Sequence, residues 1–486
     1  MIIVSVTGPR MSDALSQVAS SARHADAVEF RLDTIRSPEL AVLLLSTSKP
    51  VIATCRPVWE GGMFSGSEET RMQILSAATL LGAEYIDIEY RTSRRLLEPF
   101  LRRKREARVI LSLHLPPGKR VDPGKAYAMM KGAGADILKF AFHASDAWEN
   151  RLAFDFIERA RKDRIKAIAV AMGEAGEPSR VLYRVFGGLA TYAGTEDGKK
   201  AAPGQMAASI LKEIYRADRL NGATKIFGVV GNPVRQSKGI FVHNRLFGLS
   251  GKNAVYCRFL VGDLRKFMKK IAPSARGFSV TLPLKQTMIR YATSIDPAAR
   301  AIGAVNTLLR KGKGWWGTNT DAPAALDAIE RLIPVHGKTI LLLGAGGAAR
   351  AIAYEARKRG AAVVVANRTT AKAQALAREF HLTFVRWKGR NRVMCDIIAN
   401  ATPVGMSSAA RRSPVSPRLL KGKVVFDAVY TPPMTRLLSE ALRAGARIVQ
   451  GTDMYVNQAA RQFRLYAGVP ADVKLMKKIL FEDHRS

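Results

Sequence analysis

Residues 339–368 read TILLLGAGGAARAIAYEARKRGAAVVVANR, and this stretch decides the fold of the second half of the chain. An apolar run at 340–343 breaks at a glycine-rich turn, and a helix-patterned stretch follows until Gly360. A second apolar run occupies 362–366. Strand, glycine turn, helix and strand in this order indicate a dinucleotide-binding unit, because glycines let the backbone approach a pyrophosphate and the helix N-terminus offers N–H groups.

The residues after the second apolar run indicate which dinucleotide is bound. Asn367, Arg368 and Thr369 stand where an acidic residue would bind a ribose 2′-hydroxyl. An arginine there favours a 2′-phosphate instead, so the sequence predicts NADP(H) as the cofactor. The candidate contacts in the turn are Gly344, Ala345, Gly346, Gly347 and Ala348. The alternative is a glycine turn that serves only the close packing of a helix on a sheet.

The composition is that of a globular chain with an unusual charge. Its 486 residues suffice for roughly two to four domains, and 47% of them are apolar. The formal net charge of +37 comes from 77 basic and 40 acidic residues, and the basic residues are spread along the chain. We therefore expect no specific nucleic-acid partner, although a positive field attracts small anionic substrates.

Other patterns concern location and metal binding. Cys55, Cys257 and Cys395 are too few and too scattered for a disulfide framework or a thiolate metal site, so no metal centre is expected. The first residues, MIIVSVTGPR, lack the apolar core of a signal peptide, and no apolar run reaches the roughly 18 residues of a membrane span. These patterns predict a cytoplasmic protein without a membrane partner and leave its oligomeric state open.

The first half of the chain repeats one unit eight times, because short apolar runs alternate with helix-patterned stretches. The runs lie at 2–6, 27–30, 51–55, 85–88, 109–113, 137–140, 167–170 and 189–192. Eight strand–helix units in roughly 215 residues predict a compact (β/α)8 barrel, which we place at residues 1–218. A doubly wound sheet is the structural alternative, but it does not require eight evenly spaced units.

Charged and polar residues follow the strands of this predicted barrel, where barrel enzymes carry their chemistry. Glu29 and Arg31 alternate at the end of the second strand and therefore share a face. The candidate site residues are Glu29, Arg31, Arg56, Glu60, His114, Lys139, Arg180 and Gln205. A barrel end that served only stability would not be expected to collect such a set.

Lys139 indicates a particular chemistry. It lies inside the apolar run 137–141, where burial disfavours the ammonium form and lowers the pKa toward the free amine that a Schiff base needs. His114, which ends the preceding strand, would project beside it as a general base and acid. The alternative is an edge lysine whose ammonium group reaches solvent.

These residues resemble those of type I 3-dehydroquinate dehydratases, and the resemblance covers the whole first half. It implies that Lys139 forms an imine with the substrate ketone. It also implies that His114 removes the neighbouring proton and returns it to the departing hydroxyl, while Glu60 orients His114. The remaining implied contacts are Arg180 with the substrate carboxylate and Glu29, Arg31, Arg56 and Gln205 with its hydroxyls. One departure is Ala201, where the family has a serine in the closing loop.

A polar, helix-breaking segment at 216–224 separates the barrel from a second α/β region. We expect a smaller substrate-binding lobe at 225–321 and a Rossmann-type nucleotide lobe at 322–452. The helix-patterned segment 453–486 is expected to return to the smaller lobe. The second half therefore predicts a two-lobed α/β reductase.

Polar residues at the turns of this half fit a ketone reductase. Such an enzyme needs a proton donor beside the carbonyl oxygen and groups that hold the substrate against the nicotinamide. Lys285 follows an apolar strand and a proline, and Asp321 ends the string TNTD, so the two can form a proton-donating pair. Each string taken alone could also be a turn or a helix cap.

Together these strings resemble shikimate dehydrogenases over their full length. The resemblance implies that Lys285 and Asp321 are the catalytic pair and that Thr402 lies in a nucleotide-side loop. The implied substrate contacts are Ser237, Thr281, Asn306, Tyr430 and Gln458. One departure is Gly239, where the family has a second serine that helps to bind the substrate carboxylate. A serine restored at this position should therefore lower the KM for shikimate.

The two resemblances imply consecutive steps of one pathway. The first half would dehydrate 3-dehydroquinate to 3-dehydroshikimate, and the second half would reduce that product to shikimate with NADPH. One alternative is a quinate/shikimate dehydrogenase with a catabolic dehydratase domain. A second alternative is a non-catalytic binding protein that retains both folds, and the two intact pairs, Lys139 with His114 and Lys285 with Asp321, argue against it.

Overall fold

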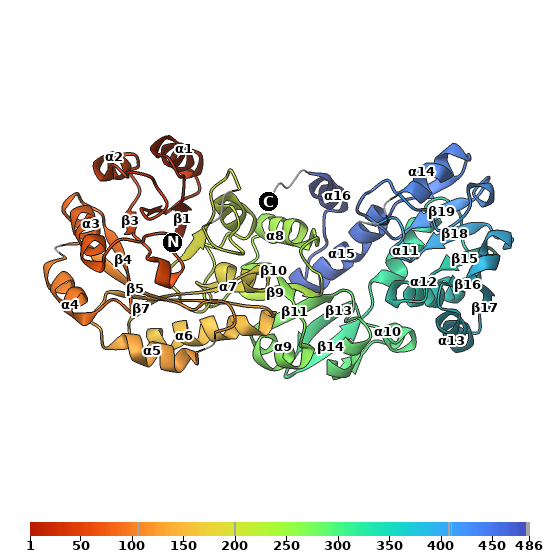
Figure 1. Ribbon diagram of the computed structural model, residues 1–486. Coiled ribbons are helices and arrows are strands. Elements are labelled where there is room, and N and C mark those ends of the chain that lie inside the picture. The colour runs from red at the N-terminus through yellow and green to blue at the C-terminus, as the bar shows by residue number, and fades with distance from the viewer. Residues whose placement is uncertain (105, 120, 199–200, 407–408, 410, 483–486) are drawn as a thin grey trace. The chain divides into compact units, whose positions relative to one another are not determined.

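The computed structural model describes all residues except 105, 120, 199–200, 407–408, 410 and 483–486 (Figure 1). The chain divides into two compact units, Met1–Ala275 and Arg276–Asp483. The last four residues of the expected C-terminal segment 453–486 lie outside the described residues.

Eight parallel strands form the main sheet of the first unit, and they confirm the eight predicted runs. They are β1 Ile2–Val6, β2 Ala27–Arg31, β3 Val51–Thr54, β4 Tyr85–Glu89, β5 Arg108–His114, β6 Ile137–His143, β7 Lys166–Met172 and β8 Thr191–Ala193. The order β7-β6-β5-β4-β3-β2-β1-β8 places sequence neighbours side by side, as in a (β/α)8 barrel. The Leu189 N–H donates to the Ala167 carbonyl (2.8 Å) just before β8, which brings the two ends of the sheet together.

Helices connect the strands and lie outside them (Figure 1). They are α1 Met11–Ser21, α2 Leu40–Leu45, α3 Glu68–Leu80, α4 Arg94–Arg103, α5 Pro123–Lys131, α6 Asn150–Lys162 and α7 Glu177–Leu182. Local sequence explains where several begin. Ser67 caps α3 by accepting the Thr70 N–H, and Asp122 caps α5 ahead of a proline in the first turn.

The barrel strands carry two kinds of buried side chain. Ile3, Ile52, Ile110 and Ile168 belong to one apolar cluster inside the first unit. Nearer the carboxyl ends of the strands the buried side chains are charged, as at Glu29, Asp87 and Lys139. The apolar cluster therefore stabilises the barrel and leaves its carboxyl end to a polar site.

The rest of the first unit is a parallel pair of strands with two helices, β9 Lys225–Gly231, α8 Gly239–Leu249, β10 Ala254–Leu260 and α9 Leu264–Lys270. This part is docked on the barrel by buried polar contacts. Asp146 Oδ2 accepts the backbone N–H groups of Gly262 (3.0 Å) and Asp263 (2.6 Å). Arg258 Nη1 lies 3.5 Å from Glu177 Oε2.

The second unit begins with four sheet strands that pair in the order β11-β13-β14-β12, which are β11 Ala275–Val280, β12 Ser294–Ile295, β13 Thr307–Lys311 and β14 Gly314–Thr318, and with α10 Pro297–Ile302. The long helix α15 Gly451–Ala467 returns to this sheet. Gln462 Nε2 donates to the Asn306 carbonyl (3.1 Å) and to Thr307 Oγ1 (2.9 Å). The last helix of the described residues is α16 Val473–Phe481.

Six parallel strands form the second sheet of this unit, β15 Thr339–Leu343, β16 Ala362–Asn367, β17 Thr383–Arg386, β18 Ile397–Asn400, β19 Val424–Asp427 and β20 Arg447–Val449. The stretch 339–368 forms β15, a glycine turn, α12 Gly347–Lys358 and β16, as predicted. The order β17-β16-β15-β18-β19-β20 is that of a Rossmann sheet. From β15 the chain adds strands first on one side, β16 and β17, and then on the other, β18 to β20. The switch point therefore lies between β15 and β18, and such sheets bind ligands there.

Helices cover both faces of this sheet, which explains its continuous apolar strands. One face packs against α11 Asp321–Glu330, α12 and α13 Thr370–Phe380 through residues that include Ile340 and Leu342. The other face packs against α14 Arg436–Arg443 through Leu341 and Leu343. Alternate residues of β15 therefore serve opposite cores.

Candidate active sites

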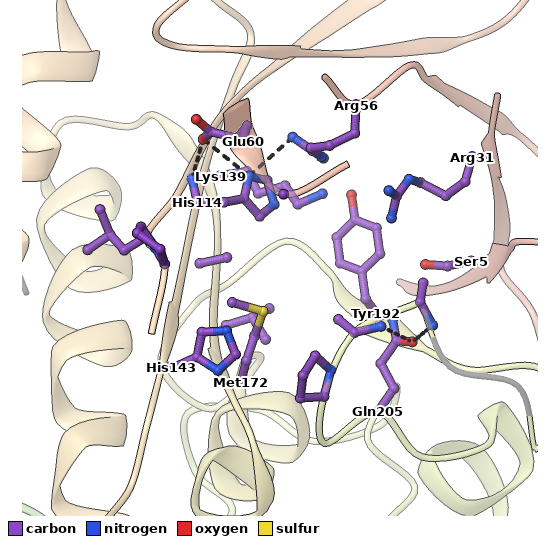
Figure 2. Close-up of a pocket in the computed structure, with 18 of the residues that line it drawn as sticks. Ser5, Arg31, Arg56, Glu60, His114, Lys139, His143, Met172, Tyr192 and Gln205 are labelled. Atoms are coloured by element: carbon purple, nitrogen blue, oxygen red, sulfur yellow. Dashed lines mark hydrogen bonds and ion pairs between the residues drawn. The ribbon is translucent and has the colours of Figure 1, made fainter. Parts of the chain in front are cut away.

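The carboxyl ends of the barrel strands surround a cavity of about 300 Å³ (Figure 2). All eight residues predicted for this half line it, and they are Glu29, Arg31, Arg56, Glu60, His114, Lys139, Arg180 and Gln205. They come from β2, β5, β6, α7 and the segments that follow β3 and β8. The structure thus brings together residues that lie up to 176 positions apart, counted from Glu29 to Gln205.

Lys139 projects into this cavity beside two carboxylates. Its Nζ donates to Asp87 Oδ2 (2.8 Å) and lies 3.8 Å from Glu29 Oε1. The same Nζ lies 4.0 Å from the centroid of the Tyr192 ring, and the residue is only 5% exposed. Lys139 is therefore buried, and on the cavity side neighbouring strands supply acidic groups beside it.

Arg56 links these carboxylates to His114. Its Nη2 donates to Asp87 Oδ1 (3.2 Å), and its Nη1 donates to Glu89 Oε1 (2.9 Å) and lies 3.1 Å from His114 Nδ1. Burial alone would raise the pKa of the Asp87 carboxyl, but Arg56 and Lys139 outweigh burial and hold that pKa well below its usual range. Asp87 is thus a fixed anion between two cations.

His114 contacts Glu60 as well as Arg56, as Figure 2 shows. Glu60 Oε1 accepts the His114 backbone N–H (2.5 Å) and lies 3.6 Å from the ring Nδ1. Burial lowers the pKa of the His114 imidazole well below its usual range, and the charges of Arg56 and Lys139 lower it further. The imidazole is therefore held neutral, which is the state that a general base requires.

Arg180 is a buried cation without an acidic partner among the described residues. It is 1% exposed, and its guanidinium donates only to the carbonyls of Tyr192 (3.1 Å) and Pro203 (3.1 Å), while Nε has no partner. Burial lowers its pKa to about 10. A cation in this situation is suited to an anionic group that enters the cavity.

The remaining predicted residues of this half are held by their neighbours. Arg31 donates from Nε and Nη2 to the two oxygens of Asp33 (2.9 and 2.8 Å). Gln205 Oε1 accepts the backbone N–H groups of Ala201 (2.7 Å) and Ala202 (3.1 Å). Gln205 therefore shapes the very loop in which Ala201 departs from the family pattern.

Sequence reasoning missed several residues that line this cavity or support it. They are Ser5, Asp87, Glu89, His143 and Tyr192. The alternation YIDIE in β4 places Asp87 and Glu89 on one face and could have revealed them. His143 carries a similar signal, because Lys139, Ala141 and His143 alternate along β6 and all line the cavity.

In the second unit the structure brings together Lys285, Asp321 and Asn306. Lys285 Nζ donates to Asp321 Oδ2 (2.5 Å), and Asn306 Nδ2 donates to Asp321 Oδ1 (2.8 Å). Both carboxylate oxygens are thus engaged, and Asp321 is buried while the lysine side chain keeps some exposure (17%). The arrangement holds one ammonium group at a defined place with access to solvent or a ligand.

Four other predicted substrate contacts are distributed around this centre or outside it. Gln458 lies on α15 one turn before Gln462, so both side chains share a face of that helix. The Tyr430 ring packs against Tyr455 of α15 (centroids 4.9 Å apart), and Thr281 directly follows β11. Ser237 belongs to the first unit, where its Oγ accepts the Gly239 N–H (3.3 Å).

The glycine turn after β15 fits a dinucleotide. Gly344 has φ +116°, and a Cβ there would lie 2.9 Å from the Ala401 carbonyl oxygen, so only glycine is tolerated without strain. A Cβ at Gly346, by contrast, would meet nothing within 4 Å, which leaves open space at the N-terminus of α12. A Cβ at Gly347 would lie 3.4 Å from Lys285 Cδ, so the predicted catalytic lysine borders the turn.

The other predicted cofactor contacts surround the same edge of the sheet. Asn367 ends β16 and donates to the Thr369 carbonyl (3.0 Å), and the exposed Arg368 stands between them in the turn before α13. Thr402 follows β18, and its methyl group approaches Gly344. Ala345 and Ala348 are part of the turn and of the first helical turn of α12.

The described ranges contain neither a cluster of metal-binding side chains nor a helix fit to span a membrane. No group of three or more His, Cys, Asp or Glu side chains is arranged to hold a metal ion there. None of the helices in the same ranges combines the length and the hydrophobicity that a bilayer span requires.

Four family models match successive parts of the chain. The type I 3-dehydroquinase model matches residues 2–221. The shikimate dehydrogenase substrate binding domain matches 229–308, and the shikimate / quinate 5-dehydrogenase model matches 327–409. The shikimate 5′-dehydrogenase C-terminal domain matches 451–481. The fold and the two lysine-centred sites therefore define an enzyme with a lyase barrel and a dinucleotide-dependent reductase in one chain.

Known proteins resemble the chain along its whole length. It is 35% identical over 511 residues to the chloroplastic bifunctional 3-dehydroquinate dehydratase/shikimate dehydrogenase of Arabidopsis thaliana, covering 98% of this chain and 84% of that protein. It is 29% identical to the shikimate biosynthesis protein AroDE of Chlamydia pneumoniae, covering 96% and 95%. A crystal structure of shikimate dehydrogenase in complex with NADP+ matches 55% of this chain and 98% of its own, with 35% identity and a TM-score of 0.52. The chain belongs to the family of bifunctional 3-dehydroquinate dehydratase/shikimate dehydrogenases.

Proposed function

We propose that the chain performs both reactions of this family with the residues assembled in its two sites. The barrel dehydrates 3-dehydroquinate to 3-dehydroshikimate, and the second half reduces 3-dehydroshikimate to shikimate. The observation that carries the proposal is the occurrence, in one chain, of the buried Lys139–Asp87 pair beside His114 and of the Lys285–Asp321 pair beside a dinucleotide turn.

In the dehydration, Lys139 Nζ in its free-amine form attacks the ketone carbon of the substrate, and loss of water from that carbon gives an iminium ion. His114 takes a proton from the adjacent carbon, and the electrons of that C–H bond form an enamine. The enamine expels the hydroxyl at the next carbon, which leaves as water after His114 returns the proton. Water then cleaves the imine and releases 3-dehydroshikimate and the free lysine.

The contacts of His114 define what must change when substrate binds. A guanidinium can only donate, so the contact from Arg56 to Nδ1 leaves the imidazole proton on Nε2. A base that acts through Nε2 must carry its proton on Nδ1, on the side of Glu60 Oε1 (3.6 Å). We propose that Arg56 turns to the substrate and that Glu60 Oε1 then accepts a hydrogen bond from the Nδ1–H group of His114.

The charges of the cavity fit the polar groups of the substrate. Arg180 has no acidic partner among the described residues and would bind the substrate carboxylate. The hydroxyl contacts would come from Glu29, Arg31, Arg56 and Gln205. Gln205 would act partly through the loop that its side chain holds at Ala201 and Ala202.

In the reduction, the protein must position the ketone and supply a proton to its oxygen. Lys285 would donate that proton, and Asp321 would hold the lysine with the support of Asn306. The substrate would be held by Ser237, Thr281, Asn306, Tyr430 and Gln458. NADPH would supply the hydride when it is bound at the crevice beside Gly344.

The cofactor assignment draws support from the turn and from the residues after β16. Gly344, Gly346 and the N-terminus of α12 would face the pyrophosphate, with Ala345, Gly347, Ala348 and Thr402 around it. Asn367, Arg368 and Thr369 would bind the 2′-phosphate of NADP(H). The structurally similar shikimate dehydrogenase is described in complex with NADP+, which agrees with this choice.

The proposal extends to boundaries and location. The dehydratase would occupy residues 1–218, the substrate lobe 225–321 with 453–486, and the nucleotide lobe 322–452. The three cysteines are free and buried, which agrees with a reducing, cytoplasmic compartment. The partners would be 3-dehydroquinate, 3-dehydroshikimate and shikimate, with no nucleic acid or membrane partner.

One experiment tests both activities together. The purified full-length protein receives 3-dehydroquinate with NADPH, and the absorbance of 3-dehydroshikimate and the loss of NADPH are followed in the same cuvette. We expect 3-dehydroshikimate to accumulate when NADPH is omitted and shikimate to form when it is present. Faster oxidation of quinate than of shikimate would favour the catabolic alternative, and absence of both reactions would favour the binding protein.

A further inference from the structure

Asp427 is a buried carboxylate at the carboxyl end of β19, and no proposed step of the reaction uses it. It is fully buried, and the groups that donate to it within the described part of the chain are uncharged. Oδ1 accepts from Asn400 Nδ2 (2.9 Å) and from the Val429 N–H (3.0 Å), while Oδ2 accepts from Thr435 Oγ1 (2.7 Å). Burial raises its pKa to about 6, so keeping this group charged is costly and packing alone does not explain it.

Asn400 connects Asp427 to the loop on the nucleotide side of the sheet. It ends β18, the strand beside β15, and it too is fully buried. Because Asp427 and the Val404 carbonyl (3.1 Å) both accept from Nδ2, the amide oxygen Oδ1 must face the other way. Oδ1 there accepts both the backbone N–H (3.0 Å) and the hydroxyl (2.6 Å) of Thr402.

Thr402 lies against the glycine turn. A Cβ at Gly344 would lie 2.9 Å from the Ala401 carbonyl oxygen and 3.3 Å from Thr402 Cγ2. The chain of contacts therefore runs from Asp427 through Asn400 and Thr402 to the turn at the switch point of the sheet. An asparagine amide is nearly symmetrical in shape, so its acceptor decides which end faces the loop.

We propose that Asp427 is a positioning residue of the cofactor site, which fixes the Asn400 amide so that Thr402 is held against the Gly344 turn in the orientation that binds the dinucleotide. This inference rests on the proposed reductase. Asp427 itself does not touch the cofactor. It acts through Asn400, and its loss leaves Nδ2 with the Val404 carbonyl as its remaining acceptor among the described residues, so the amide is held less firmly.

The test compares four variants of the full-length protein with the unaltered chain. Asp427→Ala removes the acceptor, and Asp427→Asn keeps an oxygen that can accept from Asn400 while its amide donates to Thr435. Asn400→Ala removes the side-chain amide that connects Asp427 to Thr402. Asp396→Ala is the matched control, because Asp396 Oδ2 accepts the Thr339 N–H (2.9 Å) at the amino end of β15, away from the carboxyl ends of the strands where Asp427 lies.

Two readouts do not depend on turnover. The first is amide hydrogen exchange at Thr402 in the cofactor-free protein, and the second is the Kd for NADP+ by calorimetry. We expect Asp427→Ala and Asn400→Ala to speed exchange at Thr402 and to raise Kd about tenfold, the effect of losing one hydrogen bond to a charged group. Asp427→Asn should stay within about threefold of the unaltered protein, and Asp396→Ala should change neither readout.

A double variant and the dehydratase activity of the barrel complete the test. Asp427→Ala combined with Asn400→Ala should raise Kd no more than the stronger single change, because both act on one contact chain. Dehydratase activity should be equal in all variants, which shows that the barrel is unaffected, and unchanged near-ultraviolet circular dichroism should show that the nucleotide lobe keeps its fold. The inference is overturned if Asp427→Ala matches Asp396→Ala, if Asp427→Asn is as impaired as Asp427→Ala, or if the double variant is additive. If the unaltered protein does not bind NADP+, the proposed reductase itself is wrong, and the exchange data still decide the role of Asp427.

Discussion

Lys139 Nζ donates to Asp87 Oδ2 at 2.8 Å, so the lysine proposed to form the imine rests as one half of a buried ion pair. Asp87 also accepts from Arg56 (3.2 Å) and from Ser112 Oγ (2.6 Å), and it therefore stays charged when Lys139 gives up its proton. The pair gives the amine a fixed position in the lining of the cavity. It also means that a change at Lys139 affects both chemistry and stability.

The first prediction separates these two effects. Lys139→Ala removes the nucleophile and the charge, whereas Lys139→Arg keeps the charge beside Asp87 and cannot form the imine. Both variants should lose dehydratase activity by at least about 10³-fold. Only Lys139→Ala should lower the free energy of unfolding, by about 1–3 kcal/mol, because it leaves a buried carboxylate with one partner fewer.

Chemical trapping and the reductase serve as controls for that prediction. Borohydride added during turnover should attach substrate to the peptide that contains Lys139 and inactivate only the dehydratase. The reductase activity of both variants should equal that of the unaltered chain. Label on another lysine, or activity in Lys139→Arg, would rule out the assigned imine.

The second prediction concerns the pH dependence of the dehydratase. The pKa of His114 lies well below its usual 6.5 because burial, Arg56 and Lys139 all disfavour the imidazolium. A lowered pKa keeps the basic form present as the pH falls, so the His114 imidazole should stay neutral down to pH 6.5 and gain its proton only below it. The measurement is an NMR titration of the His114 imidazole in the substrate-free protein, because an acid limb in kcat/KM would also contain Lys139, which must lose a proton before it attacks the ketone. Protonation of His114 at or above pH 6.5 would contradict the neutral imidazole.

The third prediction concerns cofactor choice. Arg368→Ala removes a planar donor that suits a 2′-phosphate, so Kd and KM for NADP(H) should rise about 10- to 150-fold while binding of NAD(H) is unchanged. Arg378→Ala is a matched control, because it removes an equal charge from the last turn of α13. Equal use of both cofactors by the unaltered chain would refute the reading of residues 367–369.

The fourth prediction concerns the Lys285–Asp321 pair. Lys285→Met should lower kcat of the reductase about 10²-fold or more, because the proton donor is lost. Asp321→Asn keeps the contact to Asn306 and loses the charge beside Lys285, and it should also lower kcat. The Kd for NADP+ and the dehydratase rate should change little in either variant. A change confined to KM would assign the pair to binding instead of proton transfer.

Much of the fold follows from periodicity. The eight runs of the first half and the strand–turn–helix–strand unit at 339–368 all become the expected elements, because parallel strands buried on both faces are continuously apolar. The barrel cavity was also predictable, since the carboxyl ends of parallel strands meet. The alternation in β4 could place Asp87 on the inner face, but the sequence could not pair it with Lys139, because the two are 52 residues apart and meet only through the pairing of β4, β5 and β6.

The fate of Gly239 shows the same limit. The resemblance to shikimate dehydrogenases predicts that a serine restored there would add a hydroxyl for the substrate and lower KM. In the structure a Cβ at Gly239 would lie 2.9 Å from Tyr256 Cε1 and 3.3 Å from Ser237 Oγ. The Tyr256 ring is buried and stacks on His243, which lies on α8 as Gly239 does (centroids 4.4 Å apart), so the ring cannot move away easily.

The fifth prediction therefore reverses the expectation from the sequence: Gly239→Ser should not lower the KM for shikimate. Replacing glycine in a helix usually stabilises it by about 0.5–1 kcal/mol, but overpacking a buried contact costs about 1–3 kcal/mol, so the clash should prevail. Gly239→Ala adds the same Cβ without the hydroxyl and is the matched control. Both variants should lower the free energy of unfolding alike in urea titrations, with no gain in shikimate KM for the serine. A lower KM in Gly239→Ser alone, at unchanged stability, would show that Tyr256 yields and that the added hydroxyl reaches the substrate.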